Sequence, residues 1–229
     1  MISRSADKVL DTVAELKGLG VQADGTAADV RNAKAVDAAF AQCAERLGKI
    51  DILVSGAAGN FPALARDISP NGFRAVMEID VLGTHHAMLA GYRHLRRPGV
   101  ILNISAAASF RAMIGQAHVC AAKAGVDQIT RTLALEWGPE GIRINSVIPG
   151  PVADTEGFKR LAPTPEAVAE RVASVPLRRA AESREVADLC LFLASERAAY
   201  ITGAVIPVDG GAMLGAPADL LVPVLAANP

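Results

Sequence analysis

Helical and extended hydrophobic patterns alternate along the whole chain. In five stretches apolar side chains recur every three or four residues, which is typical of helices that pack one face on a core. These stretches are 6–20, 32–49, 73–95, 117–138 and 184–195. Short apolar runs lie in 50–60, 99–107, 142–152 and 201–211, and a brief strand is expected within 21–30.

Strands that alternate with helices favour βαβ units and a parallel sheet covered on both faces. We therefore expect an α/β protein with a Rossmann-like doubly wound parallel sheet, in one domain covering 1–229. Asn32 is expected to cap the second helix, which should end at Gly48. The run "IDILVSG" at 50–56 is apolar without alternation, which predicts a strand buried on both faces.

The proline-rich segment 149–176 interrupts this alternation of helices and strands. It is polar and contains a single short helical pattern, near 166–173. Loops of this length are uncommon inside compact domains and are often functional. We expect 150–176 to form a lid over a site, and the alternative is a disordered insertion.

Composition narrows the class of protein. The chain is 51% hydrophobic with a formal net charge of -1, which indicates a globular protein and argues against nucleic acid as a partner. Cys43, Cys120 and Cys190 have no metal-binding spacing, so we expect no metal and a reducing compartment.

We expect neither a membrane span nor a targeting signal. No apolar run approaches the roughly 18 residues of a membrane span, so we expect no membrane partner. The start "MISRSADKV" lacks a signal-peptide core, and the end "LAANP" is not a Ser-Lys-Leu type address. We therefore expect a cytoplasmic location.

Ligands of doubly wound sheets bind outside the carboxyl ends of the strands. The small residues "GAAG" at 56–59 follow one such end and would let a flat ligand lie against the backbone. Arg4 follows the first strand, where its guanidinium suits a phosphate. These features together predict a site at this edge.

Several motifs in order carry a family resemblance. With "DILVSGAAG", "NIS", the lysine of "AAKAG" and "ITGAVIPVDGG", the chain resembles the short-chain dehydrogenase/reductase family. Within that family, "AAGNF", "VMEID", "EWGP" and "PGPVADTEGFKRL" are most similar to the peroxisomal-type 2,4-dienoyl-CoA reductases. The resemblance implies an NADPH-dependent oxidoreductase that reduces a conjugated C=C bond of a 2,4-dienoyl-CoA, an auxiliary step of fatty-acid β-oxidation. It also implies a homotetramer formed through 72–95 and 116–137.

The usual family site of Ser, Tyr, Lys and Asn is altered here. Counting back from Lys123, the Tyr position holds Val119 and the Ser position holds Ala106, and Asp80 stands for the Asn. Valine cannot transfer a proton, so the usual alcohol–ketone route should fail, and neither Tyr92 nor Tyr200 has the spacing to replace it.

The peroxisomal-type reductases share this pattern of losses. Their conjugated thioester needs charge stabilised on the thioester oxygen and then a proton on carbon, so no phenol is required. We therefore expect Asp80 and Lys123, with a water, to be catalytic. The alternative for Asp80 is a purely structural role.

The resemblance also implies the binding residues. The cofactor is expected to be NADP(H), because Arg4 and Lys8 are basic where the adenosine ribose is read. The expected cofactor residues are Arg4, Ser5, Lys8, Asp29, Val30, Ala57, Lys123, Pro149, Gly150, Val152 and Thr155. The expected substrate residues are Arg31, Asn60, Phe61, Ser69, Asn71 and Arg160, with Arg31 and Arg160 on coenzyme A phosphates.

One family segment has no counterpart in the sequence. The family begins with a strand and a TGxxxGxG turn that binds the pyrophosphate, whereas this chain starts at the equivalent of the second strand. The absent strand would lie mid-sheet, leaving a gap about 4.8 Å to each side. We expect either that the natural protein starts upstream or that this form binds cofactor poorly. A short-chain oxidoreductase with another non-Tyr route, and a catalytically silent scaffold, remain alternatives.

Overall fold

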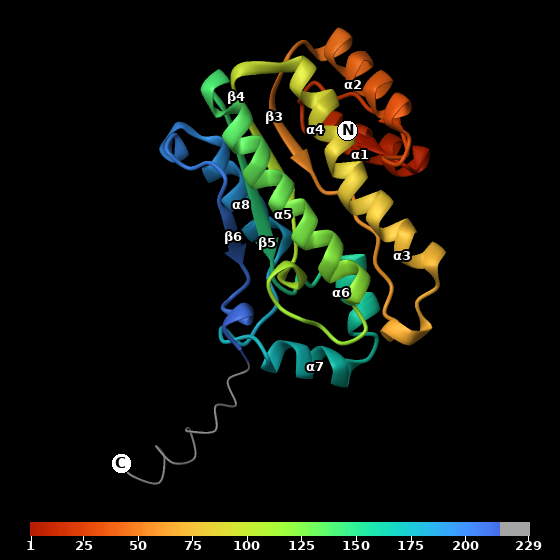
Figure 1. The fold of residues 1–229 in the computed structure, drawn as a ribbon. Helices are drawn as coiled ribbons and strands as arrows, with labels where there is room; N and C mark the ends of the chain where they lie inside the picture. Colours follow the sequence, from red (N-terminus) through yellow and green to blue (C-terminus); the bar gives the residue numbers. More distant parts are fainter. Residues whose placement is uncertain (216–229) are drawn as a thin grey trace.

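Six parallel strands carry the fold, and they form two sheets. The strands are β1 (Ile2–Ser3), β2 (Thr26–Ala27), β3 (Ile50–Ser55), β4 (Leu95–Ile104), β5 (Ile142–Pro149) and β6 (Val205–Val208). This computed structural model describes residues 1–215, so 216–229 of the predicted domain lie outside the described residues. The order is β1-β2 in one sheet and β3-β4-β5-β6 in the other. Figure 1 labels the four strands of the larger sheet. The predicted α/β fold is confirmed, and so is the gap, because β1 pairs only with β2.

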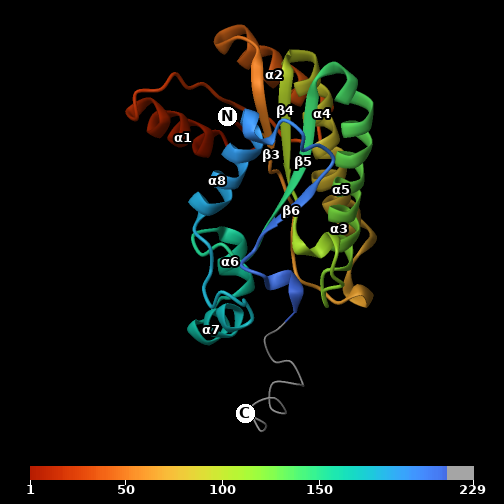
Figure 2. The same ribbon diagram turned by 90° about the vertical axis from the view of Figure 1, so that its left-hand side faces the viewer.

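Helices cover both faces of the larger sheet (Figure 2). They are α1 (Ala6–Gly18), α2 (Ala33–Leu47), α3 (Pro70–Met77), α4 (Gly83–His94), α5 (Ala117–Trp137), α6 (Glu156–Leu161), α7 (Pro165–Ala173) and α8 (Ser183–Ala194). Figure 2 shows α3, α4 and α5 on one side of the sheet and α1 and α8 on the other. Among the described residues, none of the helices has the length and apolar character to cross a membrane.

The caps predicted for α2 are confirmed. The Asn32 side chain accepts a hydrogen bond from the Ala35 backbone N–H, and Gly48 ends the helix with a positive φ of 86°. These contacts satisfy backbone groups that a helix end otherwise leaves unpaired.

The expectation that β3 is buried on both faces is wrong. Leu53 is 8% exposed and packs in the core beneath α4, but Ile52 is 46% and Val54 51% exposed. The two exposed side chains line a cavity between β3 and α8. Among the described residues, no helix packs closely on this face of β3, so both side chains remain accessible.

The helix predicted over 73–95 is continuous but not uniform. A π-helical turn, Glu78–Leu82, joins α3 to α4. π-turns are rare and are frequently found at functional sites. This one contains Asp80, whose side chain is fully buried.

The predicted lid holds one helix more than expected. The pattern near 166–173 corresponds to α7, but α6 was missed because six residues are too few to show a helical period. The start of this segment pairs with a residue just beyond its end: Ala153 N–H donates to Ala181 O at 3.0 Å, and Ala181 N–H donates to Pro151 O at 2.8 Å.

The ends of β5 and β6 approach too closely for a side chain at Gly150. A Cβ there would lie 2.6 Å from Asp209 Cα and 2.9 Å from Asp209 O. We expect Gly150→Ala to lower the free energy of unfolding by about 1–3 kcal/mol, since backbone must move. Urea titration measures this. Gly138→Ala is the control, because a Cβ there meets nothing within 4 Å, and an equal loss in both variants would contradict the explanation.

Candidate active site

A buried ion pair lies at the centre of the candidate site. Lys123 Nζ is 3.2 Å from Asp80 Oδ2, and the two side chains are 7% and 0% exposed. The structure thus brings together the two residues predicted to be catalytic, from α5 and from the π-turn. Buried charges of this kind require a partner, because desolvation strongly disfavours an isolated ion.

Neighbouring backbone groups fix both side chains. Asp80 Oδ1 accepts a hydrogen bond from Gly59 N–H at 2.6 Å, and Lys123 Nζ donates to Ile104 O at 3.1 Å. Within residues 1–215, Asp80 Oδ2 accepts no hydrogen bond, and its contact with Lys123 is an ion pair. An ammonium has three donors, so Lys123 and Asp80 both keep capacity for a further polar partner.

The pair lies behind the wall of a cavity of about 1080 Å³, which we call the main cavity. Neither Asp80 nor Lys123 lines it, whereas Ala106 and Val119, at the usual Ser and Tyr positions, do. The side chains nearest the site in the wall are therefore mostly small and apolar. A proton from the pair must reach the cavity through water or a small movement.

The predicted binding residues divide into two groups. Five line the main cavity: Asn60, Pro149, Gly150, Val152 and Thr155. The others lie off its wall: Arg4, Ser5, Lys8, Asp29, Val30, Arg31, Ala57, Phe61, Ser69, Asn71, Lys123 and Arg160. The first group comes from the loops after β3 and β5, where the strand ends were expected to meet.

Three predicted substrate residues that do not line the main cavity make contacts within the protein. Phe61 packs against His118 with ring centroids 4.3 Å apart. Ser69 caps α3 by accepting from Gly72 N–H. Asn71 Oδ1 accepts from Arg74 at 3.5 Å. These contacts position the loop between β3 and α3 beside the site.

Asp29 and Arg31, predicted to bind different groups, bind each other. Arg31 donates to both carboxylate oxygens of Asp29, with Nη2 at 2.6 Å from Oδ2. These side-chain bonds lower the pKa of Asp29 to about 2. Asp29 is therefore ionised at the end of β2, where it can accept a hydrogen bond from an adenine amino group.

Sequence reasoning missed Arg111, Gln116 and Arg171 in the cavity wall. Gln116 directly precedes α5 and is 5% exposed. Arg111 belongs to the loop after β4, and Arg171 to α7. No motif marks them, because the paths of the loop after β4 and of the segment 150–176 decide which side chains face the cavity.

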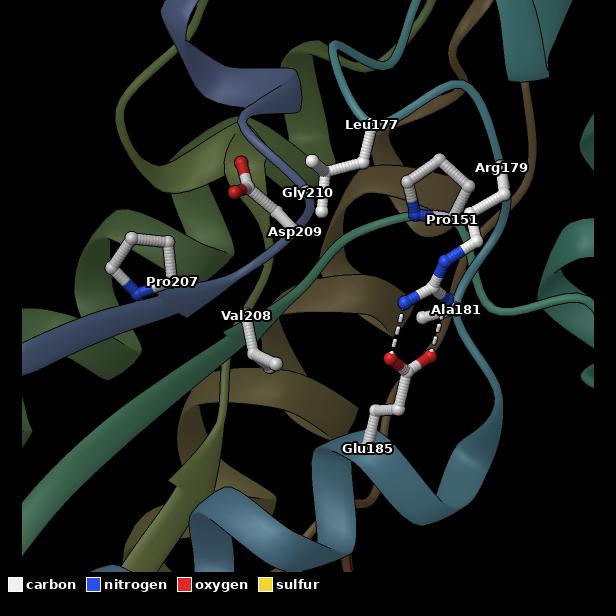
Figure 3. Close-up of a pocket in the computed structure, with 9 residues that line it drawn as sticks. All are labelled: Pro151, Leu177, Arg179, Ala181, Glu185, Pro207, Val208, Asp209 and Gly210. Atoms are coloured by element: carbon white, nitrogen blue, oxygen red, sulfur yellow. Dashed lines mark hydrogen bonds and ion pairs between the residues drawn. The ribbon is translucent and has the colours of Figure 1, made fainter.

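A second cavity, of about 270 Å³, lies at the base of the lid (Figure 3). Arg179 there donates to both carboxylate oxygens of Glu185, at 2.7 and 2.6 Å. The bond from Arg179 lowers the pKa of Glu185 to about 2. The ion pair joins the end of the lid to α8.

The residues present fit two ends of a nicotinamide cofactor. Asp29 is an ionised acceptor for the adenine end, and Lys123 has free donors for a ribose hydroxyl near the reacting end. Pro149, Gly150, Val152 and Thr155 would cover the nicotinamide from the lid side. Within residues 1–215 no three His, Cys, Asp or Glu side chains cluster as metal ligands do.

Comparisons with known proteins agree with this geometry. Residues 1–213 match a family model described as "Enoyl-(Acyl carrier protein) reductase". The chain is 42% identical to a peroxisomal 2,4-dienoyl-CoA reductase of Pongo abelii, over 95% of this chain and 76% of that protein. It is also 42% identical to a probable 2,4-dienoyl-CoA reductase of Bacillus subtilis, over 81% and 75%.

Solved structures share the fold. A gluconate 5-dehydrogenase from Burkholderia cenocepacia, crystallised with NADP and tartrate, superposes with a TM-score of 0.86 at 27% identity. The match covers 93% of this chain and 84% of that one.

The expected cytoplasmic location is wrong by the same comparisons. Relatives from Pongo abelii, Danio rerio and Rattus norvegicus, which are 42%, 40% and 41% identical to this chain, are named as peroxisomal enzymes. These names point to the peroxisome instead.

The ion pair predicts coupled effects on stability. Asp80→Ala should lower the free energy of unfolding by about 3–5 kcal/mol, because it leaves the Lys123 ammonium buried without a counter-charge. Asp80→Ala combined with Lys123→Met should cost less than the sum of the single changes. Urea titration of the four proteins measures the coupling, and strict additivity would show that the two charges do not interact.

Proposed function

The chain belongs to the short-chain dehydrogenase/reductase family, and we propose that it reduces the conjugated double bond of a 2,4-dienoyl-CoA. The observation that carries this proposal is the buried Asp80–Lys123 pair behind a wall that holds Val119 and Ala106 at the usual Tyr and Ser positions. The names of the relatives support the same substrate class. The reaction is an auxiliary step in the oxidation of unsaturated fatty acids.

The chemistry of a conjugated thioester suits these residues. Reduction places negative charge on the thioester oxygen, and the product then needs a proton on carbon. Through a water or a small movement, the buried Lys123 ammonium stabilises this negative charge, because electrostatic effects are strong where solvent is largely excluded. Asp80 holds that ammonium in place and, with Lys123 and a water, passes the proton.

NADPH is the cofactor we propose. When bound, it supplies the hydride for the reduction. Arg4 and Lys8 are exposed at the start of α1 and have the charge to favour a 2′-phosphate. Asp29 and Val30 would contact the adenine, Ala57 and Ser5 the adenosine side, and Lys123 the nicotinamide ribose.

A homotetramer is part of the proposal. The surfaces predicted to form it are 72–95 and 116–137. Leu82 is 48% exposed on the first and Leu135 is 81% exposed on the second, and contact with another subunit would remove both from water.

Variants of the pair test the mechanism. We expect Asp80→Ala and Lys123→Ala each to lower kcat for a 2,4-dienoyl-CoA by about 100-fold or more, the usual size of acid–base contributions. NADPH oxidation at 340 nm measures turnover, with folding checked by circular dichroism. Asp11→Ala, an exposed carboxylate on α1, is the control.

Activity on a panel of acyl-CoA thioesters distinguishes a dienoyl-CoA reductase from another short-chain oxidoreductase and from a scaffold. The proposal expects NADPH oxidation with dienoyl-CoA and little with 3-ketoacyl-CoA. Preference for the ketoacyl substrate would favour another short-chain oxidoreductase. Near-normal dienoyl-CoA turnover by both variants would overturn the assigned roles, and a folded wild-type protein inactive on every thioester would favour a scaffold.

A further inference from the structure

The side-chain amide of Gln116 lies in the wall of the main cavity and makes no hydrogen bond within the part of the chain that the structure describes. We propose that this amide donates a hydrogen bond to the thioester oxygen of the substrate and is a catalytic group. The assignment rests on the proposed function and adds to it a residue that reaches the reacting oxygen from the cavity wall.

Most polar side chains of the wall already bind within the protein. Backbone or side-chain partners engage Arg111, Thr155, Ser174, Ser183 and Asp209. The polar wall residues that make no side-chain hydrogen bond among residues 1–215 are Asn60, Ser105, Gln116 and Arg171.

Burial distinguishes Gln116 from the other three. Asn60 is exposed, and Arg171 is half-buried on α7. Ser105 is buried, but its hydroxyl oxygen is sealed from the cavity. The Gln116 side chain is 5% exposed, and its amide is open to the cavity that it lines. Because buried amides are normally paired, this one has its donors available for a ligand.

Gln116 lies one helical turn before the usual tyrosine position. Its backbone oxygen accepts from Cys120 N–H at 2.8 Å, which closes the first turn of α5. Residues three apart in a helix project on the same side, and Gln116 and Val119 both line the main cavity. Ala106, at the usual serine position, lines it too. The amide is therefore a hydrogen-bond donor beside the two positions that have lost their hydroxyl groups.

Backbone hydrogen bonds fix Gln116 before a ligand arrives. Gln116 N–H donates to Met113 O at 3.1 Å, and Ala63 N–H donates to Gly115 O at 3.0 Å. The segment before α5 is thereby joined to the loop after β3. A donor held in advance needs no rearrangement when charge develops, which is the condition under which such groups are most effective.

A neutral amide suits a reaction that places charge on oxygen. Reduction of the conjugated thioester increases the negative charge on the thioester oxygen, so a hydrogen bond from Gln116 Nε2 strengthens as the reaction proceeds. The amide keeps its own protons, and the proton on carbon still comes from Asp80, Lys123 and a water. Gln116 thus acts from the cavity wall, while the ion pair acts from behind it.

Removal of the donor tests this role. Gln116→Met keeps the length of the side chain, and we expect kcat for a 2,4-dienoyl-CoA to fall about 100-fold while KM changes by no more than about fivefold. NADPH oxidation measures turnover, and thermal unfolding checks the fold. The matched control is Gln22→Met, because Gln22 is exposed between α1 and β2 and lies off the wall. Normal turnover by Gln116→Met would overturn the role and leave the proposed function standing.

A second variant gives a signature that a structural role would not produce. Gln116→Glu has nearly the same shape, but an ionised carboxylate only accepts hydrogen bonds. Protonation restores an O–H donor, and the protonated fraction rises as the pH falls toward the carboxyl pKa of about 4.3. We therefore expect the ratio of Gln116→Glu to wild-type kcat to rise as the pH is lowered from about 7.5 to about 5.5. A ratio that stays constant over this range would contradict the role.

Binding of matched ligands makes the test independent of turnover. Calorimetry without reduced cofactor compares a 2,4-dienoyl-CoA with its thioether analogue, in which a CH₂ group replaces the carbonyl. The wild type should bind the thioester about fivefold more tightly, the effect of one hydrogen bond between neutral groups, and Gln116→Met should bind the two alike. This result supports the contact even if the wild type reduces no thioester and the proposed function fails. Equal binding of both ligands by the wild type, or equal weakening of both in Gln116→Met, would overturn it.

Discussion

Burying the Lys123 ammonium is the constraint on which the site depends. An ammonium at 7% exposure needs a counter-charge and hydrogen-bond acceptors, and both come from elements distant in sequence. The π-turn supplies Asp80, β4 supplies the Ile104 carbonyl, and the loop after β3 reaches Asp80 through Gly59. One charge thereby fixes the relative positions of α5, the α3–α4 junction and two strand ends. The π-turn between α3 and α4 is the local irregularity that carries the carboxylate.

Whereas the ion pair holds elements together, the divided sheet leaves one strand open. Strand β3 pairs with β4 on one side only, and Ile52 and Val54 remain open toward α8. Their exposure makes the main cavity broad and mostly apolar, and it extends from the lid to β3. In a wall of this kind the few charged side chains have large effects, because little else competes for a polar ligand.

Features of the fold that depend on residues close together in the sequence could be predicted. The caps of α2, the long period of α5 and the alternation of strands and helices depend on residues within a few positions of each other. The family resemblance named Asp80 and Lys123, but no pattern could show their ion pair or the π-turn. Exposure of β3 and the direction of Arg171 depend on neighbouring elements. Short α6 leaves too few turns for a period to appear.

The loop that contains the predicted lid, 150–176, begins and ends at the same place, because Val152 and Ala181 form a parallel bridge. Because the two ends of this loop are held together, its length can change without moving the strands of the sheet. Lengthening a closed loop adds only about 0.6 kcal/mol of closure entropy for each doubling. Residues 153–180 can therefore change in length at little cost in closure entropy while the pairing of β5 with β6 and the buried Asp80–Lys123 pair stay unchanged.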